Sequence, residues 1–259
     1  MPDPVRPDRD AMEYDVVIVG AGPSGLSCAI RLKQINPDIN VCILEKGSEV
    51  GAHLLSGAVF EPRALNELFP NWKELGAPLS VEAKSDKFLF LTKDKAFKFP
   101  TPPQMHNKGN YIISLGNLGR WLAEQAEGLG VEIFPGFAAA EILYDQDGHV
   151  IGVATGDMGL DKNGEKTESF EPGMELHARQ TVFAEGCHGS LTKQLISKYK
   201  LREHSDPQTY GLGIKEVWEI APEKHDQGAT LHTIGWPMDS KTYGGSWLYH
   251  MEDNMISIG

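Results

Sequence analysis

The residues with the clearest chemical role form a glycine-rich hexapeptide, Gly20-Ala21-Gly22-Pro23-Ser24-Gly25. It follows the apolar run Val16-Val17-Ile18-Val19 and precedes a segment with a helical pattern, residues 24 to about 36. In such a motif the first glycine permits a tight turn, the second lets the backbone approach a pyrophosphate, and the third allows the helix to pack closely on the strand. The helix N-terminus then presents N–H groups and a positive dipole to the phosphates. The hexapeptide therefore predicts a dinucleotide-binding loop.

An acidic residue stands where such a loop needs one. The next expected strand, residues 40–44, is followed directly by Glu45. In a nucleotide-binding unit, an acid at this place accepts hydrogen bonds from ribose hydroxyls. Gly51 lies about six residues further on, a spacing more typical of chains that bind FAD. A glycine-rich turn without a ligand is the alternative that the motif leaves open.

A second feature also favours FAD over NAD. The apolar segment at residues 181–186 ends in Ala184-Glu185-Gly186, far downstream of the first unit. Many flavoproteins return a strand of this kind to the first sheet, beside the nucleotide. An ordinary buried strand that enters a turn would have the same pattern. Arg120, early in a later expected helix, is a candidate partner for a phosphate, although a surface arginine fits there equally well.

The remaining pattern predicts a nucleotide-binding domain interrupted by insertions, and then a series of strands. Apolar periodicity predicts helices at residues 62–74, 115–129 and 191–199. Short strands are expected at residues 88–91, 97–99, 131–134, 142–144, 150–154 and 176–178, with a long polar loop around Asn163-Gly164. After Gly189 a long strand is expected at residues 210–218, followed by strands at 230–235, 245–250 and 255–258.

These elements predict an α/β chain: a Rossmann-like FAD-binding domain with an inserted β-meander, and the start of a second, antiparallel substrate-side domain. The expected limits are a disordered leader at residues 1–12, the FAD-binding domain at 13–190 and the second domain at 191–259. The chain ends at Gly259 directly after an apolar strand pattern, so we expect a fragment.

Composition narrows the class of function. With 259 residues, 41% hydrophobic and 23% charged, the chain resembles ordinary globular proteins with a sizeable core. A net charge of −12 gives no electrostatic support for binding nucleic acid and opposes general adhesion to anionic lipid. No apolar stretch approaches the ~18 residues that a spanning helix requires. The first dozen residues have the features of neither a secretion signal nor a transit peptide.

The three cysteines, Cys28, Cys42 and Cys187, show no CxxC spacing. We expect them to be buried small hydrophobic residues in a reducing compartment, and neither disulfides nor metal ligands. The sequence contains no Ser/His/Asp arrangement and no HExxH motif that would indicate hydrolysis. No catalytic residue and no metal ligand is assigned from the sequence.

Three stretches go beyond generic flavoprotein motifs. They are GAHLLSGA at residues 51–58, FAEGCHG at 183–189 and TYGGS at 242–246, and PQTYG at 207–211 also fits. On these residues the chain resembles the N-terminal part of electron transfer flavoprotein–ubiquinone oxidoreductases, a family of membrane-bound flavoproteins. The resemblance runs from about Tyr14 to Gly259.

The resemblance implies an activity that the motifs alone could not. In this family, electrons from reduced electron transfer flavoprotein pass through a [4Fe-4S] cluster and FAD to ubiquinone in the respiratory chain. The cluster cysteines of the family lie in a C-terminal region beyond this chain, as does the late segment that completes flavin binding. The isolated chain is therefore expected to be inactive, and the function predicted is that of the parent protein.

The resemblance also assigns roles to residues. The hexapeptide glycines with Pro23 and Ser24 match the pyrophosphate loop, and Glu45 matches the ribose acid. Gly244 and Gly245 match a glycine pair at the ubiquinone pocket, where missing side chains let the quinone head approach the backbone; a β-turn is the alternative. The predicted cofactor positions are Val17, Ile18, Val19, Gly20, Ala21, Gly22, Pro23, Ser24, Gly25, Glu45, Lys46, Arg120, Ala184 and Gly186.

Membrane contact is implied by the resemblance as well. The region from about Gly51 to Trp72 is expected to touch the bilayer from one side, at the inner membrane, on the cytoplasmic side in a bacterium or the matrix side in a mitochondrion. Burial under the flavin is the alternative for its first half. Two other classes of function stay open: an NAD(P)H-dependent flavin monooxygenase or prenyl-lipid reductase of related fold, and a non-catalytic nucleotide-binding fragment.

Overall fold

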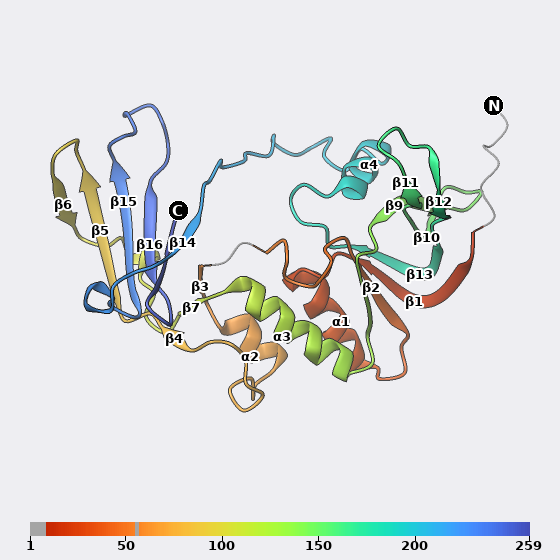
Figure 1. Ribbon diagram of the computed structural model, residues 1–259, viewed down its shortest axis with the longest axis horizontal. Coiled ribbons are helices and arrows are strands. Elements are labelled where there is room, and N and C mark those ends of the chain that lie inside the picture. Colours follow the sequence, from red (N-terminus) through yellow and green to blue (C-terminus); the bar gives the residue numbers. More distant parts are fainter. Residues whose placement is uncertain (1–8, 55–56) are drawn as a thin grey trace. The chain divides into compact units, whose positions relative to one another are not determined.

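The computed structural model of the chain describes residues 9–54 and 57–259 (Figure 1). Its contacts separate two compact units, each formed by two segments of the chain. Unit 1 comprises Met1–Leu54 and Gly119–Pro207, and unit 2 comprises Leu55–Leu118 and Gln208–Gly259. The domain limits expected from the sequence stay a prediction, and the compact units divide the chain at other places. Among the described residues, no helix has the length and apolar character needed to cross a membrane.

A six-stranded sheet forms the centre of unit 1. Its strand order is β8-β2-β1-β13-β10-β9, with the bounds Glu132–Pro135, Val41–Glu45, Ala11–Val19, Glu175–Phe183, Val150–Thr155 and Ala139–Tyr144. The first four strands are parallel, and β10 and β9 continue the sheet in antiparallel pairs. This confirms the Rossmann-like fold with an added meander.

The first strand, helix and second strand form as the sequence predicts. Helix α1 (Pro23–Ile35) follows β1 through the glycine-rich turn, with proline in its first turn, where the missing N–H costs nothing. Its inward face carries Leu26 and Ile30, which are fully buried, as is Ile18 on β1. Burying each such side chain stabilises the fold by about 1.5–3 kcal/mol, so this layer holds the turn between β1 and α1 in place.

The returning strand is confirmed. Strand β13 pairs in parallel with β1 along its length and places Phe183 opposite Val19. The separate strand expected at residues 176–178 is part of this one long strand. Strand β1 also begins earlier than expected, at Ala11, inside the predicted leader, because Met12 and Tyr14 pack against the core. Residues 1–8 of that leader lie outside the described residues.

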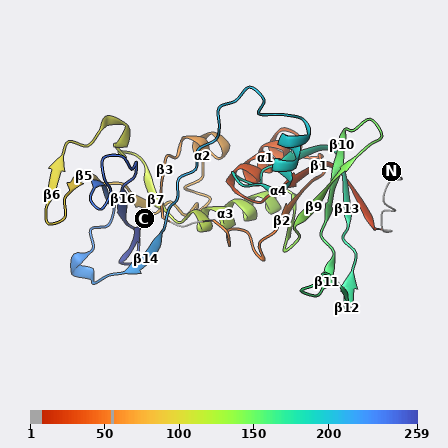
Figure 2. The ribbon, with the colours of Figure 1, turned by 90° about the horizontal axis from the view of Figure 1, so that it is seen from above.

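The prediction of a polar loop around Asn163-Gly164 was wrong, because this segment forms a hairpin. Strands β11 (Met158–Leu160) and β12 (Lys166–Glu171) pair in antiparallel fashion. They form a separate two-stranded ribbon that projects from the six-stranded sheet (Figure 2). The Asp161 carboxylate accepts the backbone N–H groups of Asn163 and Glu165 at 2.8 and 2.9 Å, which holds the turn. A two-stranded ribbon with both faces exposed buries no core, so its strands lack the apolar alternation on which the prediction relied.

Helix α3 (Leu115–Gly128) and helix α4 (Ser190–Lys198) agree with the prediction. Helix α2 is shorter than predicted: it covers Arg63–Leu68, whereas the pattern predicted a helix to residue 74. Pro70 lies two residues past its end, and a residue that precedes a proline avoids the helical conformation. Hydrogen-bonded turns follow, including Ala77 N to Trp72 O at 3.0 Å.

Unit 2 contains two sheets. The larger has the order β14-β17-β16-β15-β5-β6, with bounds Glu216–Glu219, Met255–Ile258, Ser246–His250, Ala229–Gly235, Ser85–Leu91 and Ala96–Phe99. Its pairs are antiparallel except for β15 with β5, which are parallel. The smaller has the order β3-β7-β4, with bounds Ala58–Phe60, Tyr111–Ile113 and Val81–Glu82.

The long strand predicted at residues 210–218 was wrong over most of its length. Only Glu216–Glu219 forms a strand, β14. Leu212 and Ile214 are fully and largely exposed, at 100% and 79%, and Gly211 and Gly213 separate them. Glycine weakens a strand because it has no side chain to pack, and no strand pairs with these residues in the described part of the chain.

Candidate functional site

The first glycine of the hexapeptide is required by the chain itself. Gly20 has φ +104°, a conformation that side-chain-bearing residues rarely adopt. A Cβ atom at this position would lie 2.6 Å from the carbonyl oxygen of Ala184, directly after β13. The turn and the close approach of the neighbouring strand therefore both need glycine here.

The third glycine is also required for packing. A Cβ atom on Gly25 would collide with the carbonyl oxygen of Gly20 and lie 3.2 Å from Cγ2 of Ile18. Because Gly25 begins the buried face of α1, this contact sets how closely the helix lies on β1.

The second glycine differs from both. No heavy atom of the described residues lies within 4 Å of the place where a Cβ of Gly22 would stand, and the backbone of Gly22 is extended, with φ −76° and ψ 174°. Nothing in the protein's own packing or backbone therefore requires glycine at this position. The open space next to the backbone is what a pyrophosphate at this loop would occupy.

The N-terminus of α1 is left free of competing side chains. Gly22 is its N-cap, no side chain in the described part of the chain caps the helix, and no acidic residue lies in its first turn. The first N–H groups of a helix have no partner within the helix and carry a partial positive charge. The helix therefore directs unoccupied donors toward the open space beside Gly22, which fits a phosphate group.

Glu45 is held at the edge of this loop. Its Oε2 accepts the backbone N–H of Ala21 at 2.9 Å, and its Oε1 accepts that of Gly47 at 2.7 Å. The Nδ1 atom of His53 lies 3.9 Å from Oε1. An ionised carboxylate offers about four acceptor positions, so two remain for hydroxyl donors such as those of a ribose. The predicted acid thus lies next to the predicted phosphate loop.

The other predicted cofactor positions fall into three groups. The side chains of Val17 and Ile18 are fully buried and Val19 is 5% exposed, so these residues belong to the core. Ser24, Lys46 and Gly186 are exposed. The structure brings together, at the carboxyl ends of β1, β2 and β13, the set Gly20, Ala21, Gly22, Pro23, Gly25, Glu45 and Ala184.

Arg120 lies beside the turn that follows Glu45. Its Nη1 atom is 3.9 Å from Oε1 of Glu49, and its side chain is 46% exposed. A partly exposed guanidinium near this turn keeps the phosphate role open as a proposal, and the ion pair with Glu49 is a structural role that it already has.

Sequence reasoning missed Glu185. Its carboxylate accepts the N–H groups of Leu191 and Thr192 at 3.2 and 2.7 Å, and the Thr192 hydroxyl at 2.7 Å, at the start of α4. It therefore caps this helix from the segment that follows β13, since an acidic group stabilises a helix N-terminus. The acid lies five residues before the helix, too far upstream for the usual capping pattern to indicate it.

The glycine pair predicted for the quinone lies directly before β16 in unit 2. Gly244 and Gly245 are exposed, and neither has a positive φ. A Cβ atom on Gly245 would collide with the carbonyl oxygen of Thr233 on β15, whereas one on Gly244 would meet only the flexible end of Met238. The close approach of two strands therefore already requires glycine at position 245.

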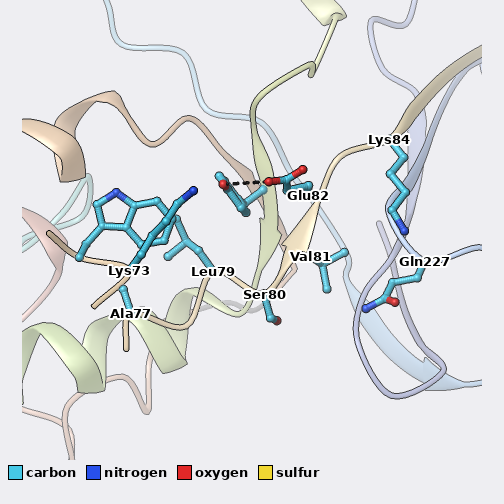
Figure 3. A pocket seen from close by; sticks show the side chains of 10 residues that line it. Lys73, Ala77, Leu79, Ser80, Val81, Glu82, Lys84 and Gln227 are labelled. Carbon is cyan, nitrogen blue, oxygen red and sulfur yellow. Dashed lines mark hydrogen bonds between the residues drawn. The ribbon is translucent and has the colours of Figure 1, made fainter. Parts of the chain in front are cut away.

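A cavity of about 420 Å³ lies elsewhere in unit 2 (Figure 3). Lys73 and Lys84 lie on its opposite sides, and the Tyr111 hydroxyl donates to Oε1 of Glu82 at 3.3 Å. Trp72, at the end of the predicted membrane region, is 5% exposed, and its ring meets that of Tyr111 edge-on at 5.7 Å. The indole of Trp72 is thus a packed wall of this cavity. Residues 55 and 56 of the same region lie outside the described residues.

The cysteines differ in environment. Cys42 on β2 is fully buried, and this burial raises the pKa of its thiol to about 12, so it stays protonated. Cys28 is half-buried. The expectation that all three are buried was wrong for Cys187, which is exposed in the turn between β13 and α4.

Comparisons with known proteins agree with the resemblance. The family model described as ETF-QO, ubiquinone-binding matches residues 210–259, and that of the Thi4 family matches residues 7–67. A solved structure, a geranylgeranyl bacteriochlorophyll reductase-like protein from Thermoplasma acidophilum, matches with a TM-score of 0.61 at 17% identity. This match covers 96% of this chain and 56% of that one, and it shows a shared fold.

Curated relatives match more closely in sequence. The mitochondrial electron transfer flavoprotein-ubiquinone oxidoreductase of Dictyostelium discoideum is 60% identical over 98% of this chain and 42% of its own length. The electron transfer flavoprotein-ubiquinone oxidoreductase of Pseudomonas aeruginosa is 59% identical over 97% of this chain and 47% of its own length. The chain thus spans less than half the length of these relatives. By its sequence, the chain belongs to the electron transfer flavoprotein-ubiquinone oxidoreductase family.

Proposed function

We propose that this chain supplies the nucleotide-binding half of the FAD site, and the start of the ubiquinone site, of an oxidoreductase. In the parent protein, electrons pass from reduced electron transfer flavoprotein through a [4Fe-4S] cluster and FAD to ubiquinone. The observation that carries the proposal is the open space at Gly22, bordered by the uncapped end of α1 and by the fixed carboxylate of Glu45. The high identity to relatives that bear this name supports the electron donor and acceptor.

Each residue of the loop has a distinct task in this proposal. The N–H groups at the start of α1 bind the pyrophosphate, and Gly22 lets it reach the backbone. Glu45 accepts hydrogen bonds from the adenosine ribose while Ala21 and Gly47 hold its carboxylate in place. Lys46 and Arg120 are proposed as cationic neighbours of the phosphates or the ribose. The bound flavin supplies a centre that accepts and releases electrons one or two at a time.

The acceptor side of the proposal rests on unit 2. Gly244 and Gly245 are proposed to line the ubiquinone pocket, and the matched ubiquinone-binding family model covers both residues. The ligands of the [4Fe-4S] cluster are proposed to lie outside this chain, because Cys28, Cys42 and Cys187 do not match the cluster ligands of the family. We further propose a one-sided contact with the inner membrane, near Gly51 to Trp72.

The test uses the full-length holoenzyme, meaning this sequence within a chain of the family's length with its flavin bound. Its absorption spectrum should show flavin and iron–sulfur bands together. Reduced electron transfer flavoprotein should reduce the flavin, and ubiquinone should reoxidise it. Direct reduction by NADPH, with no reaction with electron transfer flavoprotein, would overturn the proposal and favour a monooxygenase or a prenyl-lipid reductase.

A further inference from the structure

Two titratable side chains on neighbouring strands of unit 2 form a hydrogen-bonded pair. The Nε2 atom of His232 on β15 lies 2.8 Å from the hydroxyl oxygen of Tyr249 on β16. The rings meet edge-on, with centroids 5.4 Å apart. Trp247 stacks on Tyr249 at 4.6 Å and 17°, which holds the phenol in place. No function considered so far uses this pair.

The pair belongs to a continuous aromatic face of the six-stranded sheet. In the register, His232 is opposite Phe88 and Trp247, and Ile234 is opposite Phe90. Alternate residues of a strand point to the same side, so all these side chains share one face. We define the aromatic face by the side chains Phe88, Phe90, Phe97, Phe99, His232, Ile234, Trp247 and Tyr249.

Part of this face is accessible. Phe90 is 38% exposed and Ile234 is 40% exposed, whereas Tyr249 is only 9% exposed. His232 is half-buried and lies between the open and the covered parts. A flat, apolar ring could therefore lie over the open part and meet the imidazole edge, with the phenol behind it.

The hydrogen bond determines which ring nitrogen of His232 carries the proton. The donor in this hydrogen bond depends on the tautomer of the imidazole. Within residues 9–54 and 57–259, the Tyr249 hydroxyl has no side-chain partner other than Nε2, and we therefore take the hydroxyl as the donor. The neutral imidazole then carries its hydrogen on Nδ1. Nδ1 forms no hydrogen bond in the same part of the chain, and it is not among the buried unpaired polar atoms. His232 thus presents an unused N–H donor.

The charges around the pair keep the imidazole neutral. Burial lowers the pKa of His232, and the nearby Asp86 carboxylate on β5 opposes this only partly. Burial and the same carboxylate raise the pKa of Tyr249 to about 12. The Asp86 carboxylate accepts hydrogen bonds from Thr230 at 2.7 Å and from Asn107 at 2.7 and 3.0 Å. At neutral pH the pair is therefore an uncharged phenol–imidazole chain beside a fixed anion.

The glycine proposed for the quinone lies on the same face. Ser246 pairs with Thr233, so Gly245 stands next to Ile234, and a Cβ on Gly245 would lie 3.5 Å from Cγ2 of Ile234. His232 is two residues from Ile234 along β15, about 7 Å away. A quinone ring that lies against Gly245 therefore reaches the edge of His232.

We propose that His232 is the proton donor to the bound quinone and that Tyr249 is the positioning residue that keeps the proton on Nδ1. This inference rests on the proposed function, which supplies the quinone as electron acceptor and the reduced flavin as reductant. Conversion of a quinone to a quinol takes two electrons and two protons. The glycine pair carries no side chain that could supply a proton for this step.

The proton balance follows from the hydrogen-bond chain. As two electrons from the reduced flavin reach the quinone, one carbonyl oxygen takes the Nδ1 proton, so an O–H bond forms and the N–H bond breaks. The hydroxyl proton of Tyr249 moves to Nε2, and the imidazole stays neutral. Once the quinol leaves, Nδ1 takes a proton from solvent and the Nε2 proton returns to the phenolate, which restores the starting tautomer. The second quinone oxygen takes its proton from solvent.

The experiment measures the two halves of the reaction separately in the full-length holoenzyme. His232→Gln should lower the rate constant of flavin reoxidation by a soluble ubiquinone analogue about a hundredfold, the usual range for loss of a general acid. Tyr249→Phe should lower the same constant about tenfold, because the tautomer is no longer fixed. Both variants should keep their flavin, their reduction by electron transfer flavoprotein, and their reoxidation by ferricyanide, which needs no proton. Only the quinone step should slow in heavy water.

His250→Gln is the matched control. His250 is half-buried on the same strand as Tyr249 but points to the opposite face of the sheet, and its pKa is also lowered by burial. This variant should reduce the quinone at the rate of the unchanged protein. An equal loss of rate in His250→Gln and His232→Gln would overturn the assignment, since it would indicate a general effect on the sheet.

The outcomes also separate this inference from the proposed function. If the unchanged holoenzyme does not reduce ubiquinone, the proposed function fails. If it does, and His232→Gln reduces quinone at an unchanged rate, the proton-donor role alone fails. If His232→Gln loses its flavin, Tyr249→Phe decides, because it deletes a single oxygen atom: an unchanged quinone rate and an unchanged solvent isotope effect overturn the inference.

Discussion

The hexapeptide of unit 1 and the glycine pair of unit 2 look alike in sequence but differ in structure. At Gly22 the space of a missing side chain is open. At Gly245 the same space is filled by the carbonyl oxygen of Thr233, an atom of the chain itself. A glycine therefore indicates a ligand only where no atom of the chain itself fills the space of the missing side chain. By this criterion, Gly22 is a stronger marker of a binding site than Gly245.

The largest expected effect is the loss of flavin from Gly22→Val. A branched side chain would stand where phosphate must approach backbone, so no flavin should remain after purification. The free energy of unfolding of the flavin-free chain should change by less than about 0.5 kcal/mol, as for substitutions that meet no neighbour. Flavin absorbance per mole of protein measures the loss of flavin, and urea denaturation measures the free energy of unfolding. Normal flavin content in a folded Gly22→Val protein would contradict the FAD assignment.

Gly25→Val tests the same loop from the opposite side. Its side chain would meet the Gly20 carbonyl and Ile18, so the free energy of unfolding should fall by about 3 kcal/mol or more. Flavin should be lost here because the turn no longer forms. Urea denaturation of flavin-free protein separates the two variants: equal stability of Gly22→Val and Gly25→Val would refute the distinction between binding and packing glycines.

The next largest effects are expected from substitutions of Gly244 and Gly245. Gly245→Ala should lower the free energy of unfolding by about 1–3 kcal/mol, because even a methyl group meets the Thr233 carbonyl. Gly244→Ala should change it by less, since only the flexible end of Met238 must move. Gly244→Leu is therefore the cleaner test of the quinone pocket. It should keep its flavin and its reduction by electron transfer flavoprotein, while quinone reduction fails.

Glu185 differs from Glu45 because its carboxylate already caps helix α4, so we expect its role to be structural. Glu185→Ala should lower the free energy of unfolding by about 1 kcal/mol, as for loss of a helix cap. Glu45→Ala, at the end of β2 on the other side of β1, removes hydrogen bonds to Ala21 and Gly47 but should act mainly on flavin affinity. Flavin titration beside thermal denaturation checks both. A larger affinity loss in Glu185→Ala would reverse these roles.

The smallest expected effect concerns acid stability in unit 2. Burial opposes ionisation of Asp86, but hydrogen bonds from Asn107 and Thr230 outweigh it and lower its pKa. The group therefore adds stability above the ordinary aspartate pKa, and this stability is lost as pH falls through the lowered value. Asp86→Asn should flatten the acid side of the stability curve by less than about 1 kcal/mol. Identical acid curves for both proteins would contradict this account.

Much of unit 1 could be predicted from the sequence because its signals are local. The apolar run of β1, the glycine turn, the helical period of α1 and the acid after β2 lie within residues 11–45, and each has a short-range cause. The hairpin β9–β10 has its own turn residues, and α3 has its own apolar face. Within this local frame the sequence by itself placed Gly22 and Glu45 at one site.

The tertiary structure decided what depends on distant partners. The parallel pairing of β5 with β15 joins residues 85–91 to residues 229–235, and no local pattern specifies that register. The antiparallel pairing of β15 with β16 on the other side puts His232 beside Tyr249 and brings Thr233 against Gly245. The apolar residues near Leu212 have the pattern of a strand, yet among residues 9–54 and 57–259 no strand pairs with them. The alternation of inward and outward side chains can be read from the sequence of one strand. Which strand lies next to it in the sheet is decided only when the whole chain packs.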